Sequence, residues 1–391
     1  MKKAKRIYLD YAASTPIDPL VLKAIIPCLK KIYGNSASLH WAGQEAKEVL
    51  EKARTFFAKK MKARFNEEII FTSSATESNN LAIKGIAYSY KKKGRHILIS
   101  PIEHSSVIKP ALSLKEEGFE VEFLKVDKEG FVDLSDLEKK IRKDTILVSV
   151  HFANNELGTI EPIEKIGKIC HRKGALFHTD AAQVLDKFSI NLSKLEVDAL
   201  TGSSQKIYGP KGVGLLYLKK GTKIKPLLEG GEHEFGIRAS TVNVPLIYGF
   251  RKAYEIVLKN LKKDQKKYIF LKRKIENFII KELKGVYFTS PKKNCLNNIL
   301  NFWVEGVEGE SLLMKLNERG IAVSTGSACA SSKLEPSHVL LACGYSHYQA
   351  HSSLRISLGR FTTEKEIDYF LKSLKESIKI LRKYSPLSPN L

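Results

Sequence analysis

The chain is poor in cysteine, methionine and tryptophan, with five, three and two residues among 391. The cysteines stand at positions 28, 170, 295, 329 and 343, and they form neither a CxxC pair nor a Cys/His cluster with metal-ligand spacing. A scattered, odd-numbered set favours a reducing compartment in which most thiols are small core residues. The sequence therefore predicts no structural metal site.

Long hydrophobic runs are also absent, because no apolar stretch approaches the roughly 20 residues that a membrane helix needs. The basic start, residues 1–6, is followed at once by Ile7-Tyr8-Leu9-Asp10, without the apolar core of a signal peptide. We therefore expect a cytoplasmic protein with no membrane partner. A chain of 391 residues is too long for a single small core, so we expect two domains.

Acidic residues are few relative to basic ones, 42 against 65, which gives a formal net charge of +23. Such a charge attracts nucleic acid or an acidic protein partner, or it simply coats solvated helix faces. The lysines are spread along the whole chain, and no aromatic-interleaved basic motif or helix-turn-helix pattern stands out. We favour solvated faces and do not expect direct nucleic-acid binding.

Short β-branched runs alternate with helical stretches between residues 66 and 220, which predicts a doubly wound, largely parallel sheet covered on both faces. Ligands in such folds bind beyond the carboxyl ends of the strands. A long charged helix is expected over 253–283, and a last helix follows the capping box of Thr363 and Glu366. We expect a large domain over 15–260 and a small domain formed by 1–14 and 261–391. The predicted strands are 68–72, 96–100, 120–126, 145–152, 175–179, 199–201 and 212–218.

Two residues at predicted strand ends indicate a cofactor. Lys206 follows the strand at 199–201 and precedes a Gly-Pro-Lys-Gly turn, a placement suited to a lysine that binds a carbonyl compound covalently. Asp180 ends the strand at 175–179 and offers a carboxylate for a pyridine nitrogen. Singly, each has an ordinary explanation, a solvated lysine or a helix cap. Together they predict pyridoxal phosphate.

Further residues fit the remaining parts of such a site. Thr76 and its neighbouring amides lie at a strand end and helix entry that suit a phosphate, and Ser203 adds a hydroxyl. His104 follows a strand and offers a ring for the cofactor's face. Arg355 stands among alternating apolar residues, so we expect it half-buried in a strand, where its planar guanidinium suits a carboxylate ligand.

Cys329 lies in the run Ser324-Thr325-Gly326-Ser327-Ala328-Cys329-Ala330-Ser331-Ser332-Lys333, among small residues with no apolar neighbour to bury it. This setting suits a thiol that swings out and attacks. A thiol with an unperturbed pKa of roughly 8.5 is only partly ionised at neutral pH, so it needs a proton acceptor. His104 is the candidate. A mobile cysteine and a cofactor lysine together indicate chemistry on the sulfur of an amino acid.

Taken together, these residues resemble the cysteine desulfurases of the NifS/IscS type, which are class V, fold type I enzymes that use pyridoxal phosphate. The resemblance runs from Tyr8 to Leu387, nearly the whole chain. The long segment around Cys329 resembles the mobile loop of the members that serve iron–sulfur assembly and tRNA thiolation. The motifs that carry the resemblance are Ala75-Thr76-Glu77-Ser78, Glu103-His104, Asn154-Asn155-Glu156, Asp180-Ala181-x-Gln183, Lys206 to Gly212, Gly326 to Cys329, Leu334 to Ser337 and Ser357 to Arg360.

The resemblance implies a large domain with a mainly parallel sheet between helices, a smaller α+β C-terminal domain, and a homodimer. It implies conversion of L-cysteine to L-alanine with a persulfide on Cys329, whose sulfur passes to an iron–sulfur scaffold or a tRNA-thiolation enzyme. Gln205 stands where the family usually has histidine, and its amide can still donate to phosphate. The implied roles are cofactor attachment and proton transfer for Lys206, the pyridine nitrogen for Asp180, the ring oxygen for Gln183, stacking for His104, phosphate binding for Ala75, Thr76, Ser203 and Gln205, phosphate binding from the neighbouring subunit for Thr241, and the substrate carboxylate for Asn155 and Arg355.

Two alternatives stay open on the sequence alone. One is another class V reaction that uses pyridoxal phosphate, such as that of a selenocysteine lyase or an aminotransferase. The other is a non-catalytic scaffold of the same fold, motivated by Gln205 and by Glu232, which stands where the family usually has glycine.

Overall fold

The computed structural model describes residues 6–326 and 335–385. Its centre is a seven-stranded sheet in which only β8 runs antiparallel to its neighbours, and its strands correspond to the seven that the sequence predicts. The α/β fold with a largely parallel sheet is therefore confirmed. The strand order is β2 (Ile69–Thr72), β8 (Gly214–Leu218), β7 (Ala199–Ser203), β6 (Leu176–Asp180), β5 (Thr145–Ser149), β3 (His96–Ile99) and β4 (Glu120–Phe123).

Helices cover both faces of this sheet because successive strand residues point to opposite sides. Ile97 and Ile99 pack with one set of helices, and Leu98, between them, packs with the other. The first set is α3 (Ala75–Asn80), the π-helical turn η2 (Leu81–Gly85), α4 (Ile86–Tyr90) and α5 (Ser105–Ser113), which the short η3 (Leu114–Glu117) continues. The second is α1 (Pro19–Lys31), α2 (Trp41–Met61), α6 (Leu134–Lys140), α7 (Ile163–Arg172) and the start of α8 (Val244–Glu282).

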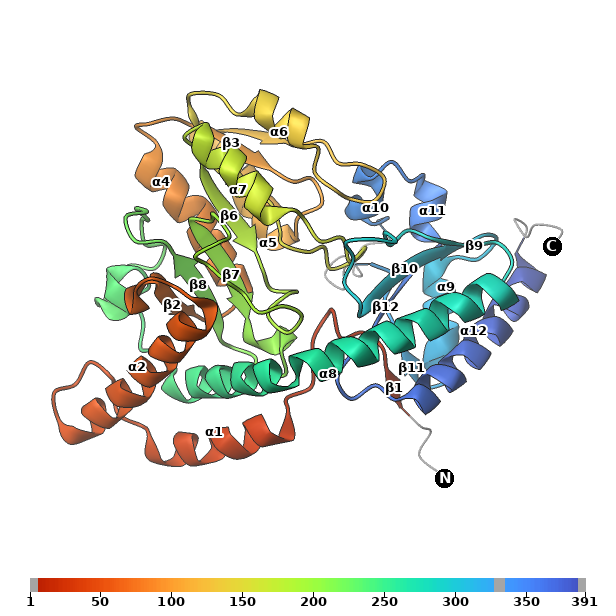
Figure 1. Cartoon of the computed structure of the whole chain (residues 1–391), viewed down its shortest axis with the longest axis horizontal. Helices are drawn as coiled ribbons and strands as arrows, with labels where there is room; N and C mark the ends of the chain where they lie inside the picture. The colour runs from red at the N-terminus through yellow and green to blue at the C-terminus, as the bar shows by residue number, and fades with distance from the viewer. Residues whose placement is uncertain (1–5, 327–334, 386–391) are drawn as a thin grey trace.

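A smaller α+β unit follows, seen beside the large sheet in Figure 1. Its antiparallel sheet has the order β12–β10–β9, and its N-terminal strand β1 pairs in parallel with β11. Ile7 and Leu9 thus belong to the core of this unit. The elements are β1 (Ile7–Tyr8), β9 (Val286–Phe288), β10 (Ile299–Val304), α9 (Gly309–Glu318), β11 (Ile321–Ala322), α10 (His338–Ala342), α11 (His347–His351), β12 (Ser353–Ser357) and α12 (Glu364–Tyr384).

The 39-residue helix α8 runs along both units (Figure 1). It begins nine residues before the predicted start because Asn243 caps it, accepting from the Leu246 amide, and Pro245 fits the first turn. Its buried residues up to Val257 join the core of the large sheet, and those from Tyr268 onward join the core of the small one. We propose that the domain boundary lies between these two residues, in agreement with the division expected at residue 261.

A buried ion pair fixes the chain before α8. Arg54 donates from both Nη atoms to the Glu234 carboxylate at 2.8 Å, and Glu234 also accepts from the Phe71 amide at 2.7 Å. Glu234 and Phe235 have φ values of 48° and 60°, a region that ordinary residues seldom adopt. The Phe235 ring lies 4.8 Å from the Arg54 guanidinium carbon. Paired buried charges therefore hold this strained turn against β2.

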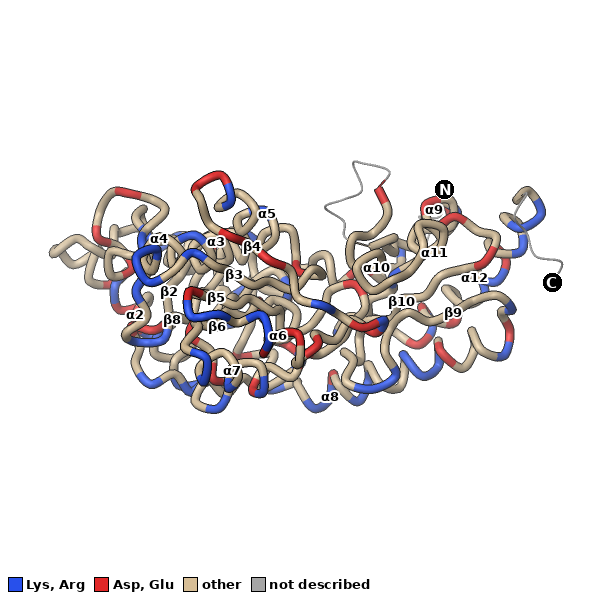
Figure 2. Tube along the Cα trace, turned by 90° about the horizontal axis from the view of Figure 1, so that it is seen from above, with Lys and Arg blue, Asp and Glu red and all other residues tan. Residues whose placement is uncertain are grey.

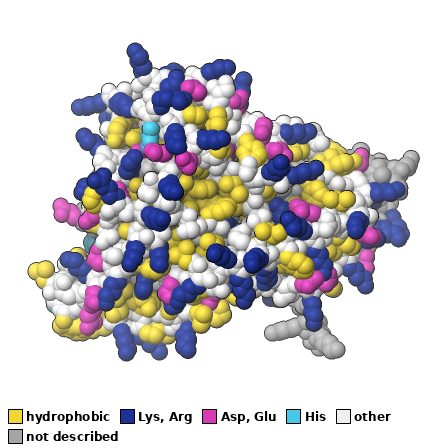
Figure 3. Space-filling model, viewed as in Figure 1, with side chains coloured by type: hydrophobic (Ala, Val, Ile, Leu, Met, Phe, Trp, Pro, Cys, Tyr) yellow, Lys and Arg dark blue, Asp and Glu magenta, His cyan; other side chains and the backbone are white. Residues whose placement is uncertain are grey.

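Charge is distributed rather than concentrated. Basic and acidic residues are interspersed along the trace in Figure 2, and basic side chains are scattered over the face shown in Figure 3. Among residues 6–326 and 335–385, no helix combines the length and the apolar character that crossing a bilayer requires.

Candidate active site

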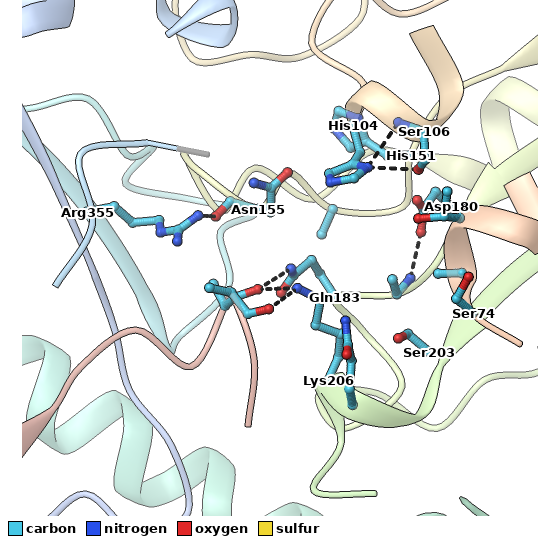
Figure 4. A pocket seen from close by; sticks show the side chains of 17 residues that line it. Ser74, His104, Ser106, His151, Asn155, Asp180, Gln183, Ser203, Lys206 and Arg355 are labelled. Carbon is cyan, nitrogen blue, oxygen red and sulfur yellow. Dashed lines mark hydrogen bonds between the residues drawn. The ribbon is translucent and has the colours of Figure 1, made fainter. Parts of the chain in front are cut away.

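A cavity of about 200 Å³ opens where the carboxyl ends of β6 and β7 meet the starts of α3 and α5 (Figure 4). This is the edge of the sheet where a doubly wound fold binds its ligands. The structure brings together ten of the residues that the sequence predicts for the site, and several more. The lining residues are Ala12, Ala13, Ser74, Ala75, Thr76, His104, Ser106, His151, Ala153, Asn155, Asp180, Ala182, Gln183, Ser203, Gln205, Lys206 and Arg355.

Lys206 enters the cavity from a short 3₁₀ turn, η4 (Ser204–Lys206), directly after β7. Its Nζ donates to the carbonyl oxygens of Ala12 and Ala13, both at 2.6 Å. Gln183 Nε2 donates to the same Ala12 oxygen at 3.0 Å. The N-terminal arm therefore forms one wall of the site and orients the lysine amine within it.

Asp180 is the last residue of β6 and is 8% exposed. One carboxylate oxygen accepts from Asn79 Nδ2 at 2.7 Å, and the other accepts from the Ala182 amide at 2.9 Å. No helix begins after Asp180, because the next residues form turns, so capping a helix does not explain this residue. Two donors hold the carboxylate in one orientation at the cavity wall.

His104 is the N-cap of α5, on the neighbouring part of the wall. The Ser106 amide donates to its Nδ1 at 3.1 Å, and the Ser106 hydroxyl lies 2.7 Å from the same atom. Burial lowers the pKa of His104 below its ordinary value, although the charge of Asp180 opposes this. The ring is therefore neutral near pH 7. Since Nδ1 accepts, its proton resides on Nε2.

The start of α3 offers donors to an anion. Ser74 caps this helix by accepting from the Glu77 amide at 3.1 Å, and the Thr76 side chain is exposed in the first turn. Helical backbone continues from Ala75 through η2 to the end of α4, so the aligned peptide dipoles favour a negative group at this end. Ser203 and Gln205 face the same cavity from the end of β7.

Arg355 reaches the cavity from β12 of the small unit. It is 1% exposed, more deeply buried than the half-buried position that the sequence predicts. Its Nη1 donates to the Asn155 carbonyl at 2.9 Å and its Nη2 to Asp10 Oδ1 at 2.7 Å. The Nε of Arg355 has no hydrogen-bond partner among the described residues. The guanidinium is thus held in place with donor capacity left for a ligand.

Two predicted site residues are not among the described residues that line this cavity. Thr241 is exposed just before α8 and does not line it. Cys329 lies outside the described residues. The described flanks of its segment border the site: the Arg355 amide donates to the Ser324 carbonyl at 2.6 Å, and Ser337 Oγ donates to Glu156 Oε2 at 2.5 Å.

Sequence reasoning missed several lining residues. Ser74 and Ser106 could have been found as polar residues in the first turns of α3 and α5. His151 follows β5 closely, so the rule that ligands bind beyond strand ends could have identified it. Ala12 and Ala13 carried no signal, because they reach the site only through the packing of the N-terminal arm.

The donor set fits pyridoxal phosphate. An amine at Lys206, a fixed carboxylate at Asp180, and a helix start with hydroxyls at Ser74 and Thr76 match its aldehyde, ring nitrogen and phosphate. The neutral ring of His104 forms a further part of the cavity wall.

Comparison with known proteins identifies the family. The model for Aminotransferase class-V matches residues 7–370. The chain is 47% identical to "Cysteine desulfurase IscS" of Dictyoglomus turgidum, over 98% of this chain and 97% of that protein. It is 45% identical to "Cysteine desulfurase IscS 1" of Archaeoglobus fulgidus, over 97% and 99%.

Solved structures agree with this result. A "NIFS-LIKE PROTEIN" superposes with a TM-score of 0.90 at 39% identity, covering 96% of this chain and all of that one. "SspA in complex with cysteine" superposes with a TM-score of 0.80 at 34% identity, covering 92% and 100%. The chain therefore belongs to the class-V aminotransferase family and, within it, to the cysteine desulfurases, which depend on pyridoxal phosphate.

Proposed function

We propose that this chain takes the sulfur of L-cysteine onto Cys329 as a persulfide and releases L-alanine. The main support is the state of the other thiols. Burial raises the pKa of Cys28, Cys170, Cys295 and Cys343 alike, to about 12 for Cys343. Because the thiolate is the nucleophile, these four are poorly suited to attack. Cys329 is the remaining cysteine.

The sulfur transfer balances without any added oxidant or reductant. The thiolate of Cys329 attacks the substrate sulfur and forms an S–S bond while the C–S bond breaks. The electron pair of that bond stays on carbon, which takes up a proton to give the methyl group of alanine. When bound, pyridoxal phosphate accepts electron density from the substrate's α-carbon, so that its proton can leave.

The residues of the cavity would divide the remaining work. Lys206 would hold the cofactor and move the α-proton, and Asp180 would keep the pyridine nitrogen protonated, with Gln183 at the ring oxygen. Ala75, Thr76, Ser203 and Gln205 would bind the phosphate, and Arg355 with Asn155 the substrate carboxylate.

His104 would stack on the cofactor ring and donate from Nε2. The hypothesis that it takes the thiol proton requires the opposite tautomer, in which Nε2 is the acceptor. In that tautomer the hydrogen bond from the Ser106 amide would be lost.

We further propose a cytoplasmic homodimer that passes its sulfur to an iron–sulfur scaffold or a tRNA-thiolation enzyme, as the family resemblance implies. Exposed apolar side chains on α1 and beyond it support a second copy: Leu22, Ile26, Leu29, Tyr33 and Trp41 are 43% to 71% exposed. A second subunit would also give Thr241 a phosphate to bind.

Alanine release from L-cysteine tests the reaction. The cofactor-loaded protein should form alanine, and Cys329→Ser should form almost none while keeping the visible absorbance of bound pyridoxal phosphate. Cys295→Ser is the matched control and should retain activity. Equal alanine release by wild type and Cys329→Ser would contradict the proposal and indicate a lyase that does not use this thiol.

A further inference from the structure

His151 lines the cavity, yet neither the reaction nor the family resemblance gives it a role (Figure 4). It follows β5 closely and is 4% exposed. The next residue, Phe152, donates its amide to the Asp180 carbonyl at 2.9 Å, so the chain at His151 runs directly beside the end of β6. A buried imidazole therefore lies in the same wall as the carboxylate expected at the pyridine nitrogen.

Glu103 fixes the orientation of this imidazole. Glu103 is fully buried, and its Oε1 accepts from the His151 backbone amide at 2.6 Å and lies 3.1 Å from His151 Nδ1. An oxygen that accepts from the amide can also accept from the ring, so Nδ1 carries a proton. The other ring nitrogen, Nε2, has no hydrogen-bond partner among the described residues. A buried, unpartnered polar atom on a residue that lines a ligand cavity indicates a partner that the described residues do not supply.

The charges around His151 favour its cationic form. Glu103 faces it from the segment after β3, Glu161 from the segment before α7, and Asp180 from β6. Although burial lowers the pKa of His151, the nearby Glu103 carboxylate above all raises it, so that the pKa lies above its ordinary value.

The remaining titratable groups nearby are consistent with the cationic form of His151. Burial raises the pKa of Glu161 to about 8, so that carboxyl is largely protonated at neutral pH, and Asp127 contributes to the rise. His338, from α10, contacts the Glu103 backbone oxygen through Nε2 at 3.0 Å. Burial also raises the pKa of Glu103, and His151 opposes that rise. The charge near the cavity is therefore best described as an imidazolium paired with Glu103.

We propose that His151, held by Glu103, is a further cofactor-contacting residue that donates from Nε2–H to bound pyridoxal phosphate. Of the polar groups on the cofactor, the phosphate is expected at α3 and the ring nitrogen at Asp180. The ring oxygen, which Gln183 would also contact, is the remaining anionic group and the one that a cation favours. This inference rests on the cofactor and is independent of the fate of the sulfur.

Cofactor titration of the cofactor-free, full-length protein tests the contact. His151→Gln should raise the dissociation constant for pyridoxal phosphate about tenfold, the loss expected for a charged hydrogen bond. His178→Asn is the matched control, because His178 is also buried but contacts Ser149 Oγ at 2.8 Å and Thr201 Oγ1 at 3.2 Å and does not line the cavity. It should leave the constant unchanged in folded protein.

The pH dependence of the bound cofactor's visible band separates this role from a purely structural one. A positive charge beside the cofactor disfavours uptake of another proton by the cofactor. Loss of the His151 charge should therefore move the midpoint of the visible band's pH titration upward by about one pH unit. Glu103→Gln should move it the same way, because His151 loses the carboxylate that stabilises its charge. If folded His151→Gln and Glu103→Gln proteins keep the wild-type dissociation constant and midpoint, the proposal is wrong.

Wild-type protein with ¹⁵N-labelled histidine provides a test that needs no substitution. His104 and His151 are the histidines among the residues lining the cavity. Addition of pyridoxal phosphate should therefore shift the ring-nitrogen signals of two histidines. A shift confined to one histidine would overturn the proposal even if the variants failed to fold.

Discussion

Replacing Lys206 with alanine is expected to slow alanine release from L-cysteine by roughly a thousandfold or more, the contribution of a positioned proton-transfer group that is also the cofactor's attachment point. The carbonyl oxygens of Ala12 and Ala13 orient its Nζ at the cavity wall. A base from the solvent would not be held in this position. The visible absorbance of the covalently held cofactor should be lost in the same protein. Steady-state alanine assays and absorbance spectra measure the two effects.

The matched control is Lys211→Ala, five residues along the same loop. Lys211 is exposed and does not line the cavity, so this variant should keep both the rate and the spectrum. A Lys206→Ala protein that retained a tenth of the wild-type rate would contradict the assignment. Loss of activity in both variants would indicate damage to the loop rather than loss of the amine.

Replacing Arg355 with lysine is expected to raise the KM for L-cysteine about ten- to a hundredfold and to change kcat less. Lysine keeps the charge but not the planar, two-pronged guanidinium that suits a carboxylate, and charged hydrogen bonds of this kind contribute about 1.5–3 kcal/mol. The side chain is buried at the cavity between Asp10 and the Asn155 carbonyl, so its position is fixed before substrate arrives. Initial-rate kinetics over a range of cysteine concentrations provide the measurement.

The Asp10→Asn variant distinguishes binding of the substrate by Arg355 from the structural role of the Asp10–Arg355 ion pair. This variant keeps the guanidinium and a possible hydrogen bond to it, and it removes the carboxylate that competes with the substrate for Arg355. Its KM should therefore change less than that of Arg355→Lys. An unchanged KM in a folded Arg355→Lys protein would show that another group binds the carboxylate.

The sheet could be predicted from the sequence because its strands are short runs rich in apolar or β-branched residues, and helical stretches separate several of them. All seven strands of the large sheet were found, and Lys206 and Asp180 fell at the ends of β7 and β6, where the parallel register brings them together. The capping box of Thr363 and Glu366 correctly predicts the residue at which α12 begins. These features depend on local sequence.

Features that depend on contacts between distant segments could not be predicted. Arg355 was expected to be half-buried, but Asp10, 345 residues earlier in the chain, compensates its charge and allows full burial. The Glu103–His151 pair joins segments that follow two different strands, and neither residue shows its partner in sequence. The start of α8 was missed because its first turns contain proline and glycine, although both are accommodated there.

The central claim, that Cys329 receives the sulfur, is tested most directly by mass spectrometry of the cofactor-loaded protein after incubation with L-cysteine and without reductant. The account predicts that the peptide containing Cys329 gains the mass of one sulfur atom while alanine appears. Peptides containing Cys28, Cys170, Cys295 and Cys343, whose thiol pKa values burial raises, should stay unmodified. Alanine formation with an unmodified Cys329 peptide, or with the added sulfur on another cysteine, would contradict the account.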